Sequence, residues 1–179
     1  MSITPDTKNW TWVLDRACPE CGFDASASPR PDVGALLREN VAAWHSLIGR
    51  PGTHTARPDP STWSPLEYAC HVRDAIKVYD LRLGLMLDQD GPAYPDWNQD
   101  ETAVASRYHE QDPAAVATDI LGLGERLAAR FDAVTGQQWD RTGFRSDGSV
   151  FTVDTFARYF IHDPIHHYWD VTRNGPTPA

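Results

Sequence analysis

Apolar residues recur every three to four positions through most of the chain, which is the period of a helix that buries one face. Four segments show this period, at residues 32–48, 64–88, 112–136 and 152–174. Each begins at a residue type that caps helix N-termini and ends close to a Gly or Pro. The pattern predicts an all-α fold, and four amphipathic helices of this length assemble most simply as a four-helix bundle.

The second of these helices has the best-defined start. Ser64 supplies an N-cap side chain, Pro65 suits the first helical position, and Glu67 lies three residues after the cap. Together they form a complete capping box, which predicts a helix that begins at this point. Asp112 followed by a proline repeats this start for the third helix, and Thr152 is the expected cap of the last one.

The remaining segments have other patterns. Residues 1–31 lack a helical period but contain several apolar side chains, so we expect an ordered N-terminal arm that packs on the bundle. Residues 93–111 are aromatic and polar, with a short helix expected near 102–109. Residues 139–151 hold a turn signal at 145–148 between short segments that pair as a small hairpin. The expected organisation is an arm at 1–31, a bundle at 32–173 and a tail at 174–179.

The charge of the chain narrows the choice of partners. Sixteen Lys and Arg against 25 Asp and Glu give a net charge of −9, with the acidic residues scattered along the chain. This balance argues against a nucleic-acid-binding face.

No apolar run approaches the roughly 20 residues that span a bilayer, and the first residues lack a secretory signal pattern. We therefore expect a cytoplasmic protein, a monomer or homodimer, that binds neither nucleic acid nor membrane.

Three histidines are candidate metal ligands. His162 and His166 are four residues apart, so on one helix their imidazoles project from the same face. Two protein ligands bind a metal weakly, so a third is needed from elsewhere. His71 is the candidate, because it lies in the middle of an otherwise apolar helix. This prediction requires the second helix to pack beside the last one.

Other polar residues lie around these three. His167 is rotated about 100° from His166 on a regular helix, so we expect it behind the ligands, in a catalytic or orienting role. Glu67 and Asp74, one turn to either side of His71, are candidates to orient the imidazole or to act as acid and base. Ordinary helix capping or solvation explains both equally well. The other three histidines are expected to be solvated, at positions 45, 54 and 109.

The residues that carry this chemistry resemble a known family. Trp63-Ser-Pro-Leu-Glu-Tyr-Ala-Cys-His71 on one helix and His162-Asp-Pro-Ile-His166-His167 on the last resemble the DinB/YfiT-like superfamily, over roughly residues 32–173. The resemblance implies a four-helix bundle with a zinc or nickel site. By matching position, its ligands are His71, His162 and His166.

The resemblance also implies candidate reactions. Characterised members of the superfamily include metal-dependent thiol S-transferases that use mycothiol or bacillithiol, and mycothiol-dependent maleylpyruvate isomerases. The Ala-, Arg- and Trp-rich composition looks actinobacterial, which favours mycothiol as co-substrate and a small electrophile as its partner. Arg82 is the candidate for binding an acidic group of the thiol, with Arg73 or Arg158 as alternatives. Other members have no demonstrated activity, so a metal-binding, stress-associated or ligand-binding module without turnover is the alternative.

The arm carries a second motif, Cys18-Pro-Glu-Cys21-Gly22, which matches half of a zinc ribbon. Three interpretations are open: a structural metal knuckle at a second site, a packed or redox dithiol, or thiols that reach the main metal site. Completing a knuckle requires further ligands from Cys70, a histidine, an acidic side chain or a second chain. Cys70 itself is expected to be a small buried residue. Three cysteines in this pattern are expected to be reduced.

Overall fold

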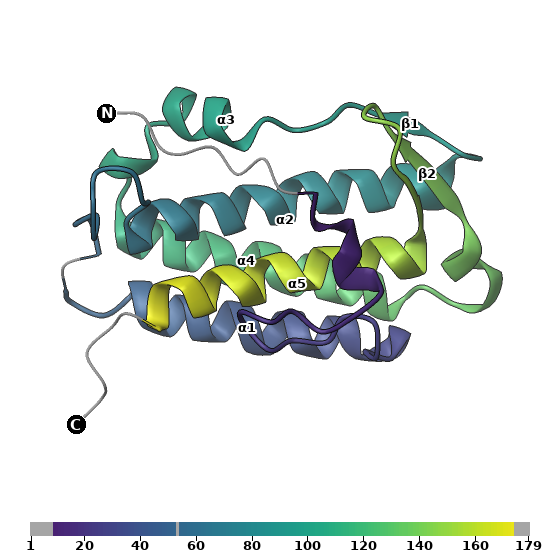
Figure 1. Cartoon of the computed structure of the whole chain (residues 1–179), viewed down its shortest axis with the longest axis horizontal. Coiled ribbons are helices and arrows are strands. Elements are labelled where there is room, and N and C mark those ends of the chain that lie inside the picture. Colours follow the sequence, from purple (N-terminus) through teal and green to yellow (C-terminus); the bar gives the residue numbers. More distant parts are fainter. Residues whose placement is uncertain (1–8, 53, 174–179) are drawn as a thin grey trace.

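The computed structural model describes residues 9–52 and 54–173, and it is the predicted four-helix bundle (Figure 1). The long helices are α1 (Val33–Ile48), α2 (Pro65–Asp88), α4 (Pro113–Asp132) and α5 (Val153–Thr172). Helices α4 and α5 each pack against both α1 and α2, whereas α1 and α2 touch little. Helix α2 therefore lies beside α5, as the histidine prediction required.

The predicted helix starts are confirmed. The Ser64 side chain accepts a hydrogen bond from the Glu67 amide at 3.2 Å, and the Glu67 carboxylate accepts one from the Ser64 amide at 2.8 Å. The Asp112 side chain caps α4, and the Thr152 side chain accepts from the Thr155 amide at the start of α5. These caps satisfy amide groups that have no partner inside the first helical turn.

The predicted hairpin is present as β2 (Thr142–Arg145) and β3 (Val150–Thr152), which pair antiparallel. A third strand, β1 (Ala93–Tyr94), pairs parallel to β2 and was not predicted, because two residues carry no period. The short helix expected near 102–109 is divided into α3 (Gln99–Ala105) and a 3-10 turn, η3 (Tyr108–Glu110). It begins earlier because the Asn98 side chain caps it, and it breaks at Arg107, whose φ is 49°.

The N-terminal arm follows the surface of α5 in the part that the structure describes (Figure 1). It contains the 3-10 turns η1 (Trp10–Leu14) and η2 (Arg30–Asp32). Outside the arm, the 3-10 turn η4 (Gly136–Asp140) precedes β2. The fully buried apolar side chains of the arm are small, at Val13, Cys18 and Ala25, while Leu14 and Phe23 are partly buried against the core. Residues 1–8 and the tail at 174–179 lie outside the described residues, so those parts of the predicted organisation stay predictions.

Helix α5 joins the arm to the rest of the bundle. Its core face packs Phe156 and Phe160 against Tyr79 of α2, with ring centroids 4.7 and 4.6 Å apart. The helix continues through Pro164, whose carbonyl accepts hydrogen bonds from the α1 side chains Asn40 at 3.1 Å and Trp44 at 3.2 Å. These contacts set the rotation of α5 about its axis. Among the described residues, no helix has the length and apolar character needed to cross a lipid bilayer.

Candidate metal centre

A cavity of about 810 Å³ lies between α2, α5, the N-terminal arm and the segment that leads into α3. Much of its lining is polar, and aromatic rings of Trp10, Trp63 and Trp97 form parts of its wall. The residues that α2 and α5 contribute include His71, Tyr79, Arg82, Tyr159, His162, Asp163, His166, His167 and Asp170. The four polar residues of the α5 motif therefore all line this cavity, namely His162, Asp163, His166 and His167.

His71 of α2 meets Asp163 and His167 of α5 at this wall, and the three residues each offer a ligand atom within 4.8 Å of the others. The Nε2 of His71 lies 3.5 Å from one Asp163 carboxylate oxygen, and the Nε2 of His167 lies 3.5 Å from the other. The two imidazole rings stand edge to face, with centroids 4.8 Å apart. Two nitrogens and a carboxylate thus converge on one point.

Three buried polar atoms of this cluster lack hydrogen-bond partners among the described residues. Both ring nitrogens of His71 and the Asp163 oxygen beside it are buried without a hydrogen bond among the described residues. Buried polar atoms are rarely left in this state, because the loss of hydration is costly. A divalent cation between the three side chains would satisfy these atoms. The donor set of two imidazoles and one carboxylate fits zinc and related ions.

Asp170 and Asp163 contact the two ring nitrogens of His167. Its Nδ1 lies 3.4 Å from Asp170, while its Nε2 faces Asp163. Burial opposes a charge on His167, but the two carboxylates outweigh burial and raise the pKa of His167 to about 9. The same contacts hold the pKa of Asp163 well below its usual range despite its burial. Without an ion this imidazole is protonated on both nitrogens at neutral pH, so a metal at Nε2 would displace one proton while the contact of Nδ1 with Asp170 keeps the ring oriented.

Packing around His71 holds its ring in place. The Trp97 ring stacks on it at 5.3 Å with a 9° angle between planes, and Trp63 contacts it at 5.3 Å. Trp97 is itself held by a hydrogen bond of 2.8 Å from its indole nitrogen to Thr102. The α3 segment thus positions a candidate metal ligand of α2, as is common for a loop beside a functional site.

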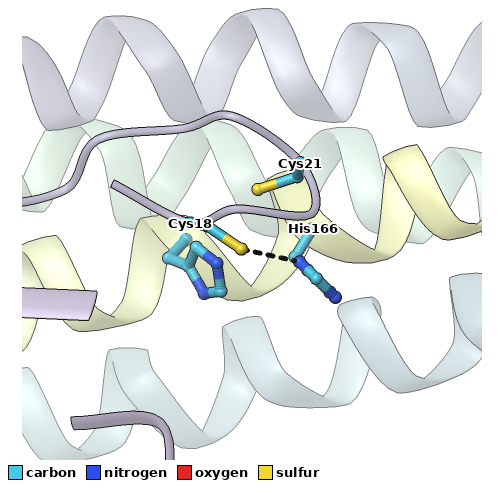
Figure 2. A group of neighbouring side chains, drawn as sticks. Cys18, Cys21 and His166 are labelled. Carbon is cyan, nitrogen blue, oxygen red and sulfur yellow. Dashed lines mark hydrogen bonds between the residues drawn. The ribbon is translucent and has the colours of Figure 1, made fainter. Parts of the chain in front are cut away.

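His162 and His166 belong to a different cluster. Their side chains meet Cys18 and Cys21 of the arm, and each of the four offers a ligand atom within 4.8 Å of the others. The Cys18 sulfur lies 3.6 Å from Nδ1 of His166 (Figure 2). Burial lowers the pKa of His162 to about 4 and lowers that of His166, and burial raises the pKa of Cys21 to about 11.

The structure therefore divides the predicted ligands His71, His162 and His166 between two clusters. Successive residues of a helix point about 100° apart, so His162 and His166 face the arm while the next residues, Asp163 and His167, face α2. His167 lies among the candidate ligands and not behind them. Metal binding by either cluster stays a prediction.

Two other predicted site residues occupy contrasting places. Glu67 is buried and does not line the cavity, because its carboxylate accepts hydrogen bonds from Arg57 and from the Ser64 amide. The structure thus places Glu67 in the capping box, and a catalytic role for it stays a prediction. Arg82 does line the cavity, and its guanidinium lies 4.9 Å from the Tyr94 ring and donates to the Pro95 carbonyl at 2.7 Å.

The other candidate site residues of the sequence analysis lie outside the cavity lining, namely Asp74, Arg73 and Arg158. Asp74 and Arg73 are paired with each other, and Asp74 also accepts a hydrogen bond from the Tyr108 hydroxyl at 2.7 Å. Arg158 donates to the Ser26 carbonyl of the arm and pairs with Asp154. Among these residues none lines the cavity. Cys70 is buried, as predicted.

Sequence reasoning missed Asp163 and Asp170. The signal for Asp163 was present, because Asp163 and His167 have the same four-residue spacing as His162 and His166. Two interleaved pairs on one helix are equivalent by spacing alone, so sequence did not distinguish the pair that faces α2. Asp170 also lies four residues after His166 and three after His167, so spacing was compatible with a contact to either ring but did not select it.

Comparison with known proteins agrees with this fold. The structure is similar to that of YfiT from Bacillus subtilis, described as "a probable metal-dependent hydrolase with an unusual four-helix bundle topology". The TM-score is 0.61 at 17% identity, and the match covers 96% of this chain and 93% of YfiT. At this identity the likeness establishes the fold alone.

Two comparisons rest on sequence. The chain is 29% identical over 172 residues to Transketolase-like protein 1 of Macaca fascicularis, a match that covers 89% of this chain but only 27% of that protein's length. The activity of that longer protein is therefore not carried over. The family model of the DinB superfamily matches residues 38–171. Because this span takes in most of the chain, with all of α2 and nearly all of α5, the chain belongs to the DinB superfamily.

Proposed function

We propose that this chain is a metal-dependent enzyme in which His71, Asp163 and His167 hold one divalent ion, zinc or nickel. The observation that carries the proposal is that these three donors, with unsatisfied buried atoms, meet at the wall of a cavity of about 810 Å³. Three protein ligands leave one or two coordination positions open, which is the arrangement of catalytic rather than structural zinc sites.

We propose that the sulfur of a low-molecular-weight thiol, mycothiol, attacks a small electrophile. The outcome is either transfer of the thiol to the electrophile or isomerisation of the electrophile. A bound divalent ion lowers the pKa of a thiol beside it, so that the nucleophilic thiolate is present at neutral pH. The residues of the chain bind the ion and orient the ligand rings. Asp170 holds the His167 ring, and Trp97 and Trp63 hold the His71 ring and keep that side of the site apolar.

The far wall of the cavity is suited to a polar co-substrate. Arg82 and Arg145 bring positive charge to it, while Asp96 and Asn98 bring acceptors. The Arg82 guanidinium is oriented by the Pro95 carbonyl and Tyr94 ring and keeps donors for an acidic group. Mycothiol is rich in hydroxyl groups, so these side chains support it as a ligand. Binding by Arg82 is part of the proposal.

Metal-dependent hydrolysis is the second candidate. The likeness in fold to YfiT, described as a metal-dependent hydrolase, favours it. The same open positions would accept water in place of a thiol, and nearby carboxylates are available to take its proton. The two candidates share the metal site and differ in the nucleophile.

The test is a thiol-conjugation assay on the metal-loaded protein. We expect conjugation of mycothiol to monochlorobimane well above the metal-free control, and a loss of at least about tenfold in the His71→Gln and His167→Gln variants. The matched control is His109→Gln, which changes a solvent-exposed histidine outside the cavity. Metal content of each variant is measured in parallel.

Other outcomes decide against the thiol reaction. Metal-dependent cleavage of an activated ester with no thiol present, and no conjugation with any thiol, would favour the hydrolase. Absence of both activities in metal-loaded protein would favour a binding module without turnover. Full metal retention in both histidine variants would overturn the assignment of the ligands.

A further inference from the structure

The second cluster, Cys18, Cys21, His162 and His166, plays no part in the proposed reaction. It joins a loop of the arm to two histidines of α5, which also line the cavity. Figure 2 shows Cys18 and Cys21 on one loop above α5, with the Cys18 sulfur directed at the His166 ring. Three of the four side chains are almost fully buried, with exposed fractions of 1% for Cys18, 4% for His162 and 5% for His166.

The loop has the backbone of a metal knuckle. The Gly22 amide donates to the Cys18 carbonyl at 2.9 Å, and the Cys18 amide donates to the Phe23 carbonyl at 2.9 Å. Gly22 has a φ of +75°, a conformation that side chains rarely adopt, and this glycine lets the chain turn back at once. The turn brings the two sulfurs to the same side, toward α5.

The distances suit a tetrahedral ion. Zinc bonds of about 2.0–2.1 Å to nitrogen and 2.3 Å to sulfur place neighbouring ligand atoms about 3.3–3.8 Å apart. The 3.6 Å between the Cys18 sulfur and Nδ1 of His166 falls within this range. All four donor atoms lie within 4.8 Å of one another, so small side-chain rotations complete the tetrahedron.

A buried His162 nitrogen without a hydrogen bond, and a His166 ring oriented by carboxylates, also indicate a cation at this cluster. Nε2 of His162 is buried with no hydrogen-bond partner among the described residues. On the opposite side of His166, Nε2 lies 3.6 Å from carboxylate oxygens of both Glu20 and Asp170. A carboxylate on one imidazole nitrogen directs the other nitrogen to a metal. The Trp10 ring lies over both imidazoles, at 5.4 Å from His162 and 4.9 Å from His166.

We propose that Cys18, Cys21, His162 and His166 bind a structural zinc ion, separate from the ion held by His71, Asp163 and His167. Two thiolates neutralise the double charge of the ion, which suits a buried position. Four protein ligands close the coordination shell, so the site takes no substrate. The ion attaches the arm to α5, where the fully buried apolar side chains of the arm are small.

The site explains why the sequence holds two interleaved ligand pairs on one helix. His162 and His166 meet the cysteines of the arm, while Asp163 and His167, one position further along, meet His71 of α2. The arm contributes Asn9, Trp10 and Glu20 to the cavity lining. The structural ion would therefore hold one wall of the cavity in place. This proposal stands independently of the reaction proposed above.

The experiment is cobalt substitution of the full-length protein with metal counting. We expect two ions per chain, and a cobalt(II) spectrum with a thiolate-to-cobalt charge-transfer band and the strong visible bands of a tetrahedral site. The Cys21→Ser and His162→Gln variants should lose the charge-transfer band or shift it strongly, and should lose about one ion per chain. His71→Gln should keep the band.

The matched control is Cys70→Ser, which removes the third cysteine at a buried site outside the cluster. It should keep the charge-transfer band at full intensity. Absence of that band in wild-type protein saturated with cobalt would overturn the proposal, whatever the variants do. Retention of the band in both Cys21→Ser and Cys18→Ser would overturn it too. A Cys18–Cys21 disulfide in protein purified without oxidant would contradict it in the same way.

Discussion

Asp170 contacts a histidine of each of the two clusters. One of its carboxylate oxygens lies 3.4 Å from Nδ1 of His167 and 3.6 Å from Nε2 of His166. Arg173 holds the other oxygen at 3.4 Å. Because the two rings belong to different proposed sites, Asp170 is a positioning residue for both. Asp170 belongs to no predicted motif, and we infer its role from these contacts alone.

Replacing Asp170 by Asn should weaken both sites. The variant loses the carboxylate charge that orients the two imidazoles, so we expect metal affinity to fall about 10- to 100-fold at the His71 site and measurably at the cysteine site. Competition with a chromophoric chelator measures both constants. Asp154→Asn on the same helix is the control, since Asp154 pairs with Arg30 and Arg158 and not with a histidine. Unchanged affinities in Asp170→Asn would remove its positioning role.

At the scale of elements, α2 depends on its first turn. Glu67 closes the capping box and pairs with Arg57, whose Nε donates to it at 2.8 Å. Burial raises the pKa of Glu67, but the hydrogen bonds from Arg57 and Ser64 outweigh burial and lower it below the ordinary 4.5. A group with a lowered pKa stabilises the fold above its unfolded pKa, and this stabilisation is lost as the pH falls through the folded pKa.

Glu67→Gln tests this element directly. The amide still accepts from the Ser64 backbone but cannot pair with Arg57, so the free energy of unfolding should fall by about 1–2 kcal/mol at neutral pH. Urea denaturation should show that the difference from wild type narrows well below pH 4.5. Glu39→Gln, at an exposed position of α1, should change stability little. A large loss of turnover with unchanged stability in Glu67→Gln would return Glu67 to a catalytic role.

At the scale of the molecule, the arm is part of the fold without belonging to the bundle core. It covers α5 and completes one wall of the cavity, yet its buried apolar residues are small. A segment with so little buried apolar surface is held weakly by the hydrophobic effect. Ligation to the proposed zinc would supply the missing attachment.

Limited trypsin digestion tests that attachment. Arg16 is exposed two residues before Cys18, and cleavage after it should rise about tenfold or more when a chelator removes the metal. Cys21→Ser should be equally sensitive without chelator, whereas His71→Gln should not. Cleavage after the exposed Arg107, which lies in the turn after α3, serves as the internal reference. Equal sensitivity of Arg16 with and without metal would show that other contacts hold the arm.

The sequence alone determined the helices and the family. Period and caps located α1, α2, α4 and α5 to within a few residues, because capping boxes and amphipathic stripes are local properties of the chain. The hairpin and an arm packed on the bundle followed from local patterns as well. The residues around His71 and His162 were enough to indicate the DinB superfamily.

The tertiary structure alone decided which side chains meet. His162 and His166 have the same spacing as Asp163 and His167, and only the rotation of α5, set by its packing on α1 and α2, directs one pair to the arm and the other to His71. The parallel pairing of β1 with β2 and the contact of Cys18 with His166 likewise join residues far apart in sequence. Spacing along a helix determines which residues share a face, whereas packing determines what that face meets.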